Sequence, residues 1–216
     1  MFEEIETKKK RSVAGTILGI FVLLAAIAGV AVAAYTWNYT SSNANTIGTG
    51  NISMSLLEST DVINIGDALP MSDANGMAQG EDDSFDFAVT TNASGAPGNI
   101  NYTISITKID PTSGYTRLPD NNVKVYLSAL TEDGEDQVMA PTLISNIITA
   151  GNTGTLTFDS GKTSYLTHVH TSADTTNTTK YRLRMWVDSN TDASSWTSAT
   201  KYEYKLKIGV SGNLTA

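Results

Sequence analysis

Apolar and polar side chains alternate along most of the chain after residue 50, a period of two that is typical of β-strands with one buried face. In the last run, apolar residues occupy every second position from Tyr202 to Val210. Earlier runs place apolar residues at Ile52, Met54 and Leu56; at Phe85, Phe87 and Val89; at Ile100, Tyr102, Ile104 and Ile106; at Val123, Val125, Leu127 and Ala129; and at Tyr181, Leu183, Met185 and Val187. No helical period follows residue 34. The sequence therefore predicts an all-β fold, a jelly roll or β-sandwich of about seven or eight strands.

Three stretches fit this alternation less well. Residues 142–149 suit either a strand or a short helix, while Leu156 and Phe158 indicate only a short strand. Residues 61–83 form a long connection without a sustained period. Connections of this length are usually functional or partly disordered.

The polar positions of two late runs are expected to face solvent. Arg182, Arg184 and Trp186 alternate with the apolar residues of one run, and Lys205 and Lys207 with those of the other. If the two strands pair, the four basic residues form a strip. Such strips are more often solvated or paired with acidic neighbours than used for binding.

Composition limits the classes of function. The chain has no cysteine, which excludes disulfides, thiolate metal sites and a cysteine nucleophile. Its formal net charge is −8, and no stretch of residues 35–216 clusters lysine and arginine as nucleic-acid binding requires. We expect no nucleic-acid partner and no cofactor.

A long apolar segment follows a basic start. Residues 13–34 carry no charge, and four basic residues precede them: Lys8, Lys9, Lys10 and Arg11. As a helix the segment would rise about 33 Å, enough to cross a hydrocarbon core of about 30 Å. The basic run sets the membrane topology, because it favours the cytoplasmic side and sends residues 35–216 outward.

Two fates for this segment stay open. Ala31 and Ala33 form an A-x-A site, so the segment can be a signal peptide that is cleaved after Ala33 or Ala34. Its length and the aromatic residues just beyond it also suit a retained single-pass anchor. The predicted organisation is a signal peptide or transmembrane segment at 1–34, an aromatic segment and flexible spacer at 35–50, and a β-sandwich domain at 51–216.

The aromatic segment has a period of two of its own. Tyr35, Trp37 and Tyr39 alternate with polar residues, which predicts an amphipathic strand. Once freed by cleavage, such a strand can add to a sheet edge of another subunit as a donor strand. In a retained anchor, the same three residues would form an interfacial aromatic belt.

Motifs for chemistry are weak. His168 and His170 would share one face of a strand, but no third metal ligand can be named, and we expect two solvated histidines at a loop edge. The acidic clusters 81–83 and 132–136 lack the spacing of a calcium loop and are expected to be solvated turns. No zinc-protease or nucleophile-elbow motif is present. The sequence therefore predicts no catalytic residue, no metal ligand and no enzyme.

Six asparagines begin an N-x-[ST] acceptor for glycosylation: Asn38, Asn51, Asn92, Asn101, Asn177 and Asn213. In a chain so rich in asparagine, serine and threonine, several such motifs arise by chance. Glycosylation at these positions is therefore an open possibility.

The order of features resembles the TasA/camelysin group of secreted proteins. The resemblance lies in KKKRSVAGTILGIFVLLAAIAGVAVAAYTWNY followed by IGTGNISMSLLES, in the strands starting at Phe85 and Ile100, and in YRLRMWVDS. It implies processing by a dedicated signal peptidase and a jelly-roll domain that forms extracellular fibres of the biofilm matrix. The metallopeptidase label of the camelysins finds no zinc motif here, so no catalytic residue is carried over.

Three functions follow as expectations. The first is a subunit of a surface filament or biofilm matrix, which self-assembles into a homopolymer after contacting the membrane at least transiently through residues 13–34. The second is a single-pass, membrane-anchored β-sandwich domain that binds a surface ligand or partner. The third is a pilin-type filament subunit with a retained N-terminal helix. All three place residues 35–216 outside the cell or at its surface.

Overall fold

Alternating side chains form strands because a pleated strand points successive residues to opposite faces, so one face can be buried. The computed structural model of the chain describes residues 36–40, 47–49, 52–58, 63–66, 69–93, 98–171, 175–196 and 200–215. Within them lie thirteen strands, β1 to β13, with a few short helices. All described residues except Thr36 and Trp37 belong to one compact unit, Asn38–Ala216.

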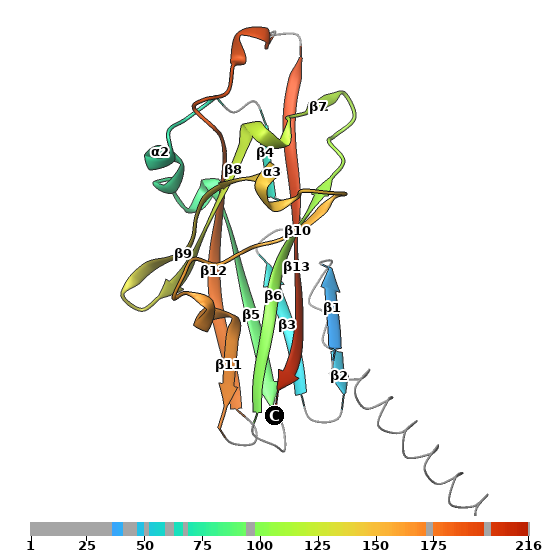
Figure 1. The fold of residues 1–216 in the computed structure, drawn as a ribbon, viewed down its shortest axis with the longest axis vertical. Helices are drawn as coiled ribbons and strands as arrows, with labels where there is room; N and C mark the ends of the chain where they lie inside the picture. Colours follow the sequence, from blue (N-terminus) through green and yellow to red (C-terminus); the bar gives the residue numbers. More distant parts are fainter. Residues whose placement is uncertain are drawn as a thin grey trace, which may run out of the picture. The chain divides into compact units, whose positions relative to one another are not determined.

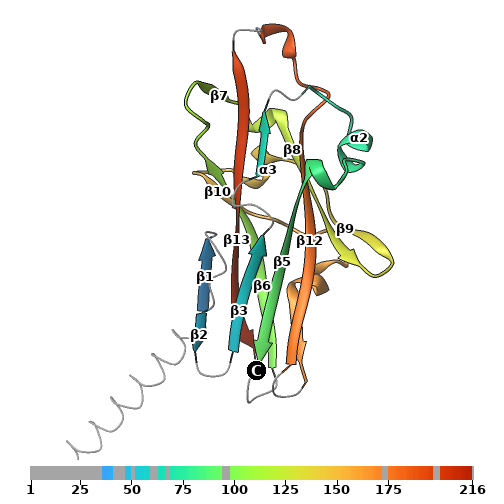
Figure 2. The same ribbon diagram turned by 180° about the vertical axis from the view of Figure 1, so that it is seen from behind.

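The strands form two sheets (Figures 1 and 2). Among the pairings of strands β2 to β13, that of β7 with β13 is parallel and the others are antiparallel. The seven-stranded sheet has the order β1 (Thr36–Thr40), β13 (Lys201–Thr215), β6 (Gly98–Ile109) and β10 (Thr153–Thr155), with β4 (Ile63–Gly66) and β7 (Tyr115–Arg117) on β13 and β11 (Thr167–His170) on β6. The six-stranded sheet has the order β2 (Ile47–Thr49), β3 (Ile52–Glu58), β5 (Ser84–Ala93), β12 (Thr175–Val187), β8 (Val123–Thr131) and β9 (Gly134–Leu143).

The helical pieces are all short. The described residues contain α2 (Asp73–Met77), α3 (Ile144–Ile147) and the 3-10 turns η1 (Glu81–Asp83), η2 (Asp120–Asn122), η3 (Thr163–Leu166) and η4 (Ala193–Ser195). None of the described helices has the length and apolar character needed to cross a membrane.

The core lies between the two sheets, and most of its residues are ones that the alternation marked as inward. Val89, Leu127 and Leu183 of the six-stranded sheet are fully buried, as are Ile104 and Leu206 of the seven-stranded sheet. Burying a side chain of this size contributes roughly 1.5–3 kcal/mol. The prediction of an all-β sandwich is confirmed.

Several details of the prediction are wrong. The count of seven or eight strands is too low, because strands such as β7 and β10 are only three residues long and show no pattern. The strand expected at Leu156 and Phe158 lies earlier, at β10. Both residues are nevertheless buried in the core. For residues 142–149, where a strand or a short helix was expected, the short helix α3 is confirmed, directly after β9.

Residues 69–83 run along the outer face of the six-stranded sheet, and we call them the strap. Ser72 caps α2 by accepting a hydrogen bond from the Asn75 backbone N–H at 3.4 Å. The strap is held to β12 by the hydrogen bond from Met71 N to Val187 O at 3.0 Å. Figure 1 shows α2 beside the upper part of β12.

The strap overturns the expected exposure of one strand face. Arg182, Arg184 and Trp186 were expected in solvent, but their exposed fractions are 8%, 5% and 0%. The predicted basic strip is also wrong, since β12 and β13 belong to different sheets and cannot align Arg182 with Lys205.

Candidate functional site

The edge of the seven-stranded sheet contains the segment that the sequence proposed as a donor strand. Residues Thr36–Thr40 form β1, which stands next to β13 in the strand order. On β13, β6 covers one edge along Lys205–Thr215, so β4, which pairs at Glu203–Leu206, and β1 share the other edge. A strand is thus confirmed at 36–40. The side chains of Trp37 and Tyr39, and the whole of Tyr35, lie outside the described residues.

An arginine–carboxylate cluster lies on the outer face of the six-stranded sheet, and it comprises Glu81, Asp86, Glu135, Arg182 and Arg184. Arg182 donates to both oxygens of Asp86, each at 2.7 Å, and also to Glu81 and Glu135 at 3.0 Å. Arg184 donates to both oxygens of Glu135 at 2.6 and 2.8 Å. Bidentate pairs of this kind are the strongest hydrogen-bonded ion pairs in proteins.

The guanidinium donors of this cluster are used internally. Arg184 Nε donates to the Gln79 carbonyl at 2.8 Å, and Ser128 donates to Glu135 at 2.8 Å. The hydrogen bonds from Arg184 are the main reason that the pKa of Glu135 falls to about 2. With three carboxylates facing two arginines, the cluster is suited to fastening the strap to the sheet and not to binding an external anion.

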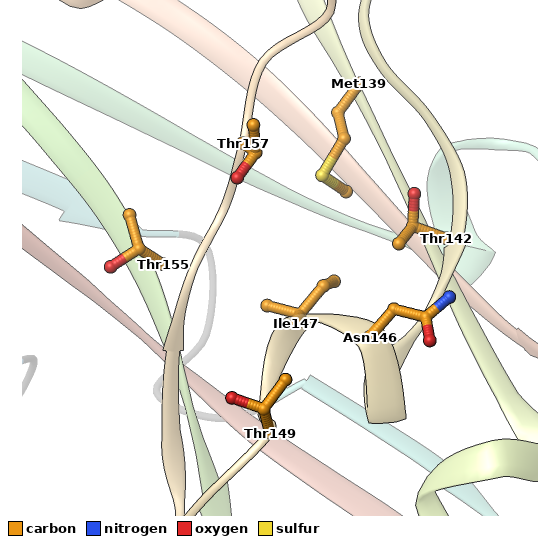
Figure 3. Close-up of a pocket in the computed structure, with 7 residues that line it drawn as sticks. All are labelled: Met139, Thr142, Asn146, Ile147, Thr149, Thr155 and Thr157. Carbon is orange, nitrogen blue, oxygen red and sulfur yellow. The ribbon is translucent and has the colours of Figure 1, made fainter.

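A hollow beside α3 has room for a small ligand (Figure 3). Its volume is about 290 Å³. It is lined by Met139, Thr142, Asn146, Ile147, Thr149, Thr155 and Thr157. In Figure 3 the apolar Met139 and Ile147 lie between Thr155 and Thr157 on one side and Thr142 and Asn146 on the other.

The chemistry of this hollow is neutral and polar. Its seven lining residues carry no charge, and they offer hydroxyl and amide groups around a small apolar centre. This combination suits a small uncharged ligand with its own hydroxyl groups. We did not predict the hollow from the sequence, whose only signal is the alternation of threonine at positions 153, 155 and 157.

The two histidines are buried, so the expectation that they are solvated at a loop edge is wrong. His168 is 5% exposed and His170 is 2% exposed. The reason is the position of β11, which pairs with β6 and points both imidazoles toward β5 and β12 of the other sheet. No group of three or more possible metal ligands occurs in the part of the chain that the structure describes.

The acidic clusters are mostly exposed, as expected for turns, but not all of their side chains are solvated. Glu81 and Glu135 belong to the arginine–carboxylate cluster described above. Asp136 accepts hydrogen bonds from Lys162 at 2.6 and 2.8 Å and from Tyr165 at 2.7 Å.

Four of the six glycosylation motifs have described side chains. Asn92 donates to Thr176 at 3.1 Å, Asn177 donates to the Val169 carbonyl at 2.8 Å, and Asn101 accepts from Thr167 at 2.7 Å. Asn213 is exposed on β13, opposite Asn101 in the strand register. The side chain of Asn38 and the whole of Asn51 lie outside the described residues.

The other predicted site residues also lie outside the described residues. They are the topology residues Lys8, Lys9, Lys10 and Arg11 and the cleavage residues Ala31, Ala33 and Ala34.

Comparison with known proteins yields little. No protein-family model and no curated protein matches the chain. A structure of the infectious bursal disease virus Gx strain is 9% identical with a TM-score of 0.31, and the match covers 76% of this chain and 32% of that one. The carbohydrate-binding module TmCBM61, solved with β-1,4-galactotriose, is 11% identical with a TM-score of 0.23, and the match covers 73% and 86%. These scores are too low to support any argument.

Proposed function

We propose that this protein is an extracellular structural subunit that assembles into a surface filament or biofilm matrix by donor-strand addition. The observation that carries the proposal is β1, because the residues directly after the apolar segment form a strand at an edge of the seven-stranded sheet. The same assembly is what the resemblance to the TasA/camelysin group implies. Secretion, cleavage after Ala33 or Ala34 and the jelly-roll order of the strands belong to this proposal.

The physical basis is the hydrogen-bonding capacity of a sheet edge. The edge of β13 that β6 leaves open presents backbone groups that a further strand can satisfy. A strand from the same chain and a strand from a neighbour satisfy these groups equally well. Residues 41–46 separate β1 from β2 of the six-stranded sheet in sequence and are rich in serine, threonine and asparagine, a composition that suits a linker.

Exchange of β1 between subunits gives an open assembly. Each subunit donates β1 to one neighbour and accepts β1 from another, so the contact is head-to-tail. A head-to-tail contact that does not close into a ring extends without limit. The product is a filament, and the role is structural and not enzymatic.

The test compares the protein starting at Tyr35 with a protein starting at Ser41, by electron microscopy and light scattering. We expect filaments from the first and folded monomers from the second. Trp37→Ser should shorten or abolish the filaments, whereas Thr36→Ser, on the opposite face of β1, should leave them unchanged. Filaments of equal length from all four proteins would overturn the proposal.

The hollow beside α3 favours a second candidate, a membrane-anchored domain that binds a surface ligand. In this case residues 13–34 remain as the anchor, and the neutral lining of the hollow takes a small hydroxylated molecule. An intact Met1 or Phe2 in the membrane fraction, found by mass spectrometry, would favour this candidate over the free filament subunit.

A further inference from the structure

A chain of hydrogen bonds joins β11 to the opposite sheet through the two histidines. Thr91 Oγ1 lies 2.7 Å from His168 Nδ1 and 2.9 Å from His170 Nε2, so one hydroxyl bridges both rings. The outer nitrogens reach β12, with His168 Nε2 2.8 Å from Thr179 Oγ1 and His170 Nδ1 2.9 Å from Thr175 Oγ1. We call these five residues the histidine chain.

The histidine chain is fully satisfied, and carries no charge, when both rings are neutral. A neutral imidazole has one donor and one acceptor nitrogen, and a threonine hydroxyl donates one hydrogen bond while it accepts another. Thr91 therefore donates to one ring and accepts from the other. All hydrogen bonds in the chain then run in the same direction, and each donor has an acceptor. A proton on one ring makes both of its nitrogens donors, so its charge faces only neutral hydroxyls. A proton on both rings would make Thr91 accept from both, and its own hydrogen would have no acceptor in the chain.

No carboxylate of the described residues hydrogen-bonds to either imidazole. In the described part of the chain, the side chains that hydrogen-bond to either ring are the three threonines and Tyr102 of β6, whose hydroxyl is 3.5 Å from His168 Nε2. Behind Tyr102 lies Tyr181 of β12, and both phenols have a pKa raised by burial. The Tyr165 carbonyl of η3 accepts from both phenols at 2.6 and 2.7 Å.

Among the titratable groups that the structure describes, the one whose charge also acts on His168 is His170. Burial, with a smaller contribution from His170, lowers the pKa of His168 to about 4. An unfolded histidine binds its proton near a pH of about 6.5. The stability that depends on neutral His168 is therefore complete above about pH 6.5, falls as the pH decreases, and stops falling near about pH 4.

We propose that His168, linked to His170 through Thr91, forms an acid-sensitive latch, which holds β11 against the six-stranded sheet at neutral pH and releases it when the buried His168 ring gains a proton. Release separates β11 from β6 at residues 98–101, where the two strands pair. It frees that edge of β6 and opens one end of the sandwich. The latch is independent of the filament proposal, since it involves neither β1 nor the edge of β13 to which β1 adds.

Hydrogen exchange on the full chain in detergent tests the latch, after correction for the intrinsic effect of pH on exchange. Between about pH 7 and about pH 4, residues 167–170 and 98–101 should lose protection by about tenfold or more, while the pairing of β8 with β12 stays protected. Equal loss across the whole sandwich, or no loss at β11, would overturn the proposal.

Substitutions separate the latch from other acid effects. The double variant His168→Gln and His170→Gln keeps polar side chains but cannot titrate, so its protection at β11 should not change between the two pH values. Asp174→Asn is the control for the carboxylate next to Thr175 in the sequence. In this variant β11 should lose protection at acid pH as it does in the wild type. An unchanged acid response in the double variant, or its loss in Asp174→Asn, would contradict the latch.

A direct titration keeps the proposal testable if the double variant fails to fold. The chain contains only two histidines, so their ring signals in nuclear magnetic resonance spectra are unambiguous. We expect the His168 ring to stay neutral until β11 loses protection, and to gain its proton together with that loss. A His168 ring that titrates near its ordinary pKa while β11 stays protected would overturn the proposal.

Discussion

Gly76 of α2 lies against the indole ring of Trp186, so close that a Cβ atom on residue 76 would be 2.2 Å from Cδ2 of the ring. Trp186 is fully buried by this contact, although it points away from the core between the sheets. The contact explains why the strap can pack on the sheet at this position, because any side chain on residue 76 would displace the ring.

We predict that Gly76→Ala destabilises the protein by about 1–3 kcal/mol, the usual cost of overpacking a well-packed site. Gly80→Ala is the matched control, because no atom lies within 4 Å of a Cβ built there. Urea unfolding followed by tryptophan fluorescence measures both. Equal midpoints for the two variants would show that the strap does not pack tightly on Trp186.

A second prediction concerns acid stability. Arg184 and Ser128 hold the pKa of Glu135 at about 2, below its ordinary value. Glu135 therefore contributes stability above its unfolded pKa, near about pH 4.3, and this contribution is lost as the pH falls toward about 2. Glu135→Gln should lower the unfolding free energy at pH 7, and its difference from the wild type should shrink as the pH falls through this range.

Glu132→Gln is the control for this prediction, since Glu132 is exposed in the same turn. Its unfolding free energy should match that of the wild type at each pH. A constant difference between Glu135→Gln and the wild type from pH 7 down to about pH 2 would contradict the assigned role of the Glu135 carboxylate.

A third prediction separates the two faces of β13. Tyr204 is 1% exposed, and its hydroxyl donates to Asp120 at 2.8 Å. Tyr204→Asp should prevent folding, because it buries an unpaired charge in the core. Tyr204→Phe loses only the hydrogen bond and should cost about 1 kcal/mol. Far-ultraviolet circular dichroism and urea unfolding distinguish these outcomes, and a folded Tyr204→Asp variant would contradict the inward assignment.

Substitution of the neighbouring residue Lys205 is expected to cost less stability than Tyr204→Asp. Lys205 lies 3.4 Å from the carboxylate of Glu203, which is 3% exposed, and donates to Thr112 at 2.6 Å. Lys205→Asp replaces this attraction with repulsion, so it should cost about 1 kcal/mol or more without preventing folding. A variant as stable as the wild type would show that the pair contributes nothing measurable.

The sequence was sufficient for the inward faces of the strands. Leu183 and Ile208 are buried where the period of two places them, because burial of one strand face follows from local alternation alone. The sequence was insufficient to predict the burial of the outer strand faces. Arg184 and Trp186 are buried by the strap, which is distant in sequence and has no periodic pattern of its own.

The prediction that the two histidines are solvated was wrong for the same reason. A strand of four residues with the sequence THVH has no apolar face to mark it as buried. Its burial depends on β6, β5 and β12, which are brought together only by the complete fold. The hollow beside α3 likewise combines β9, α3 and β10 with residues that have no unusual local pattern.

The central claim is that β1 passes between subunits, and disulfide trapping tests it most directly because the chain has no cysteine of its own. One protein starting at Tyr35 carries Asn38→Cys, and partner proteins carry single cysteines on β13 at Lys207, Gly209 or Ser211. We predict that mixing the two kinds and oxidising them yields covalent heterodimers, and that a chain with both cysteines yields a ladder of multimers. If the doubly substituted chain forms filaments and yet closes only on itself as a monomer, β1 stays within its own subunit and the claim is wrong.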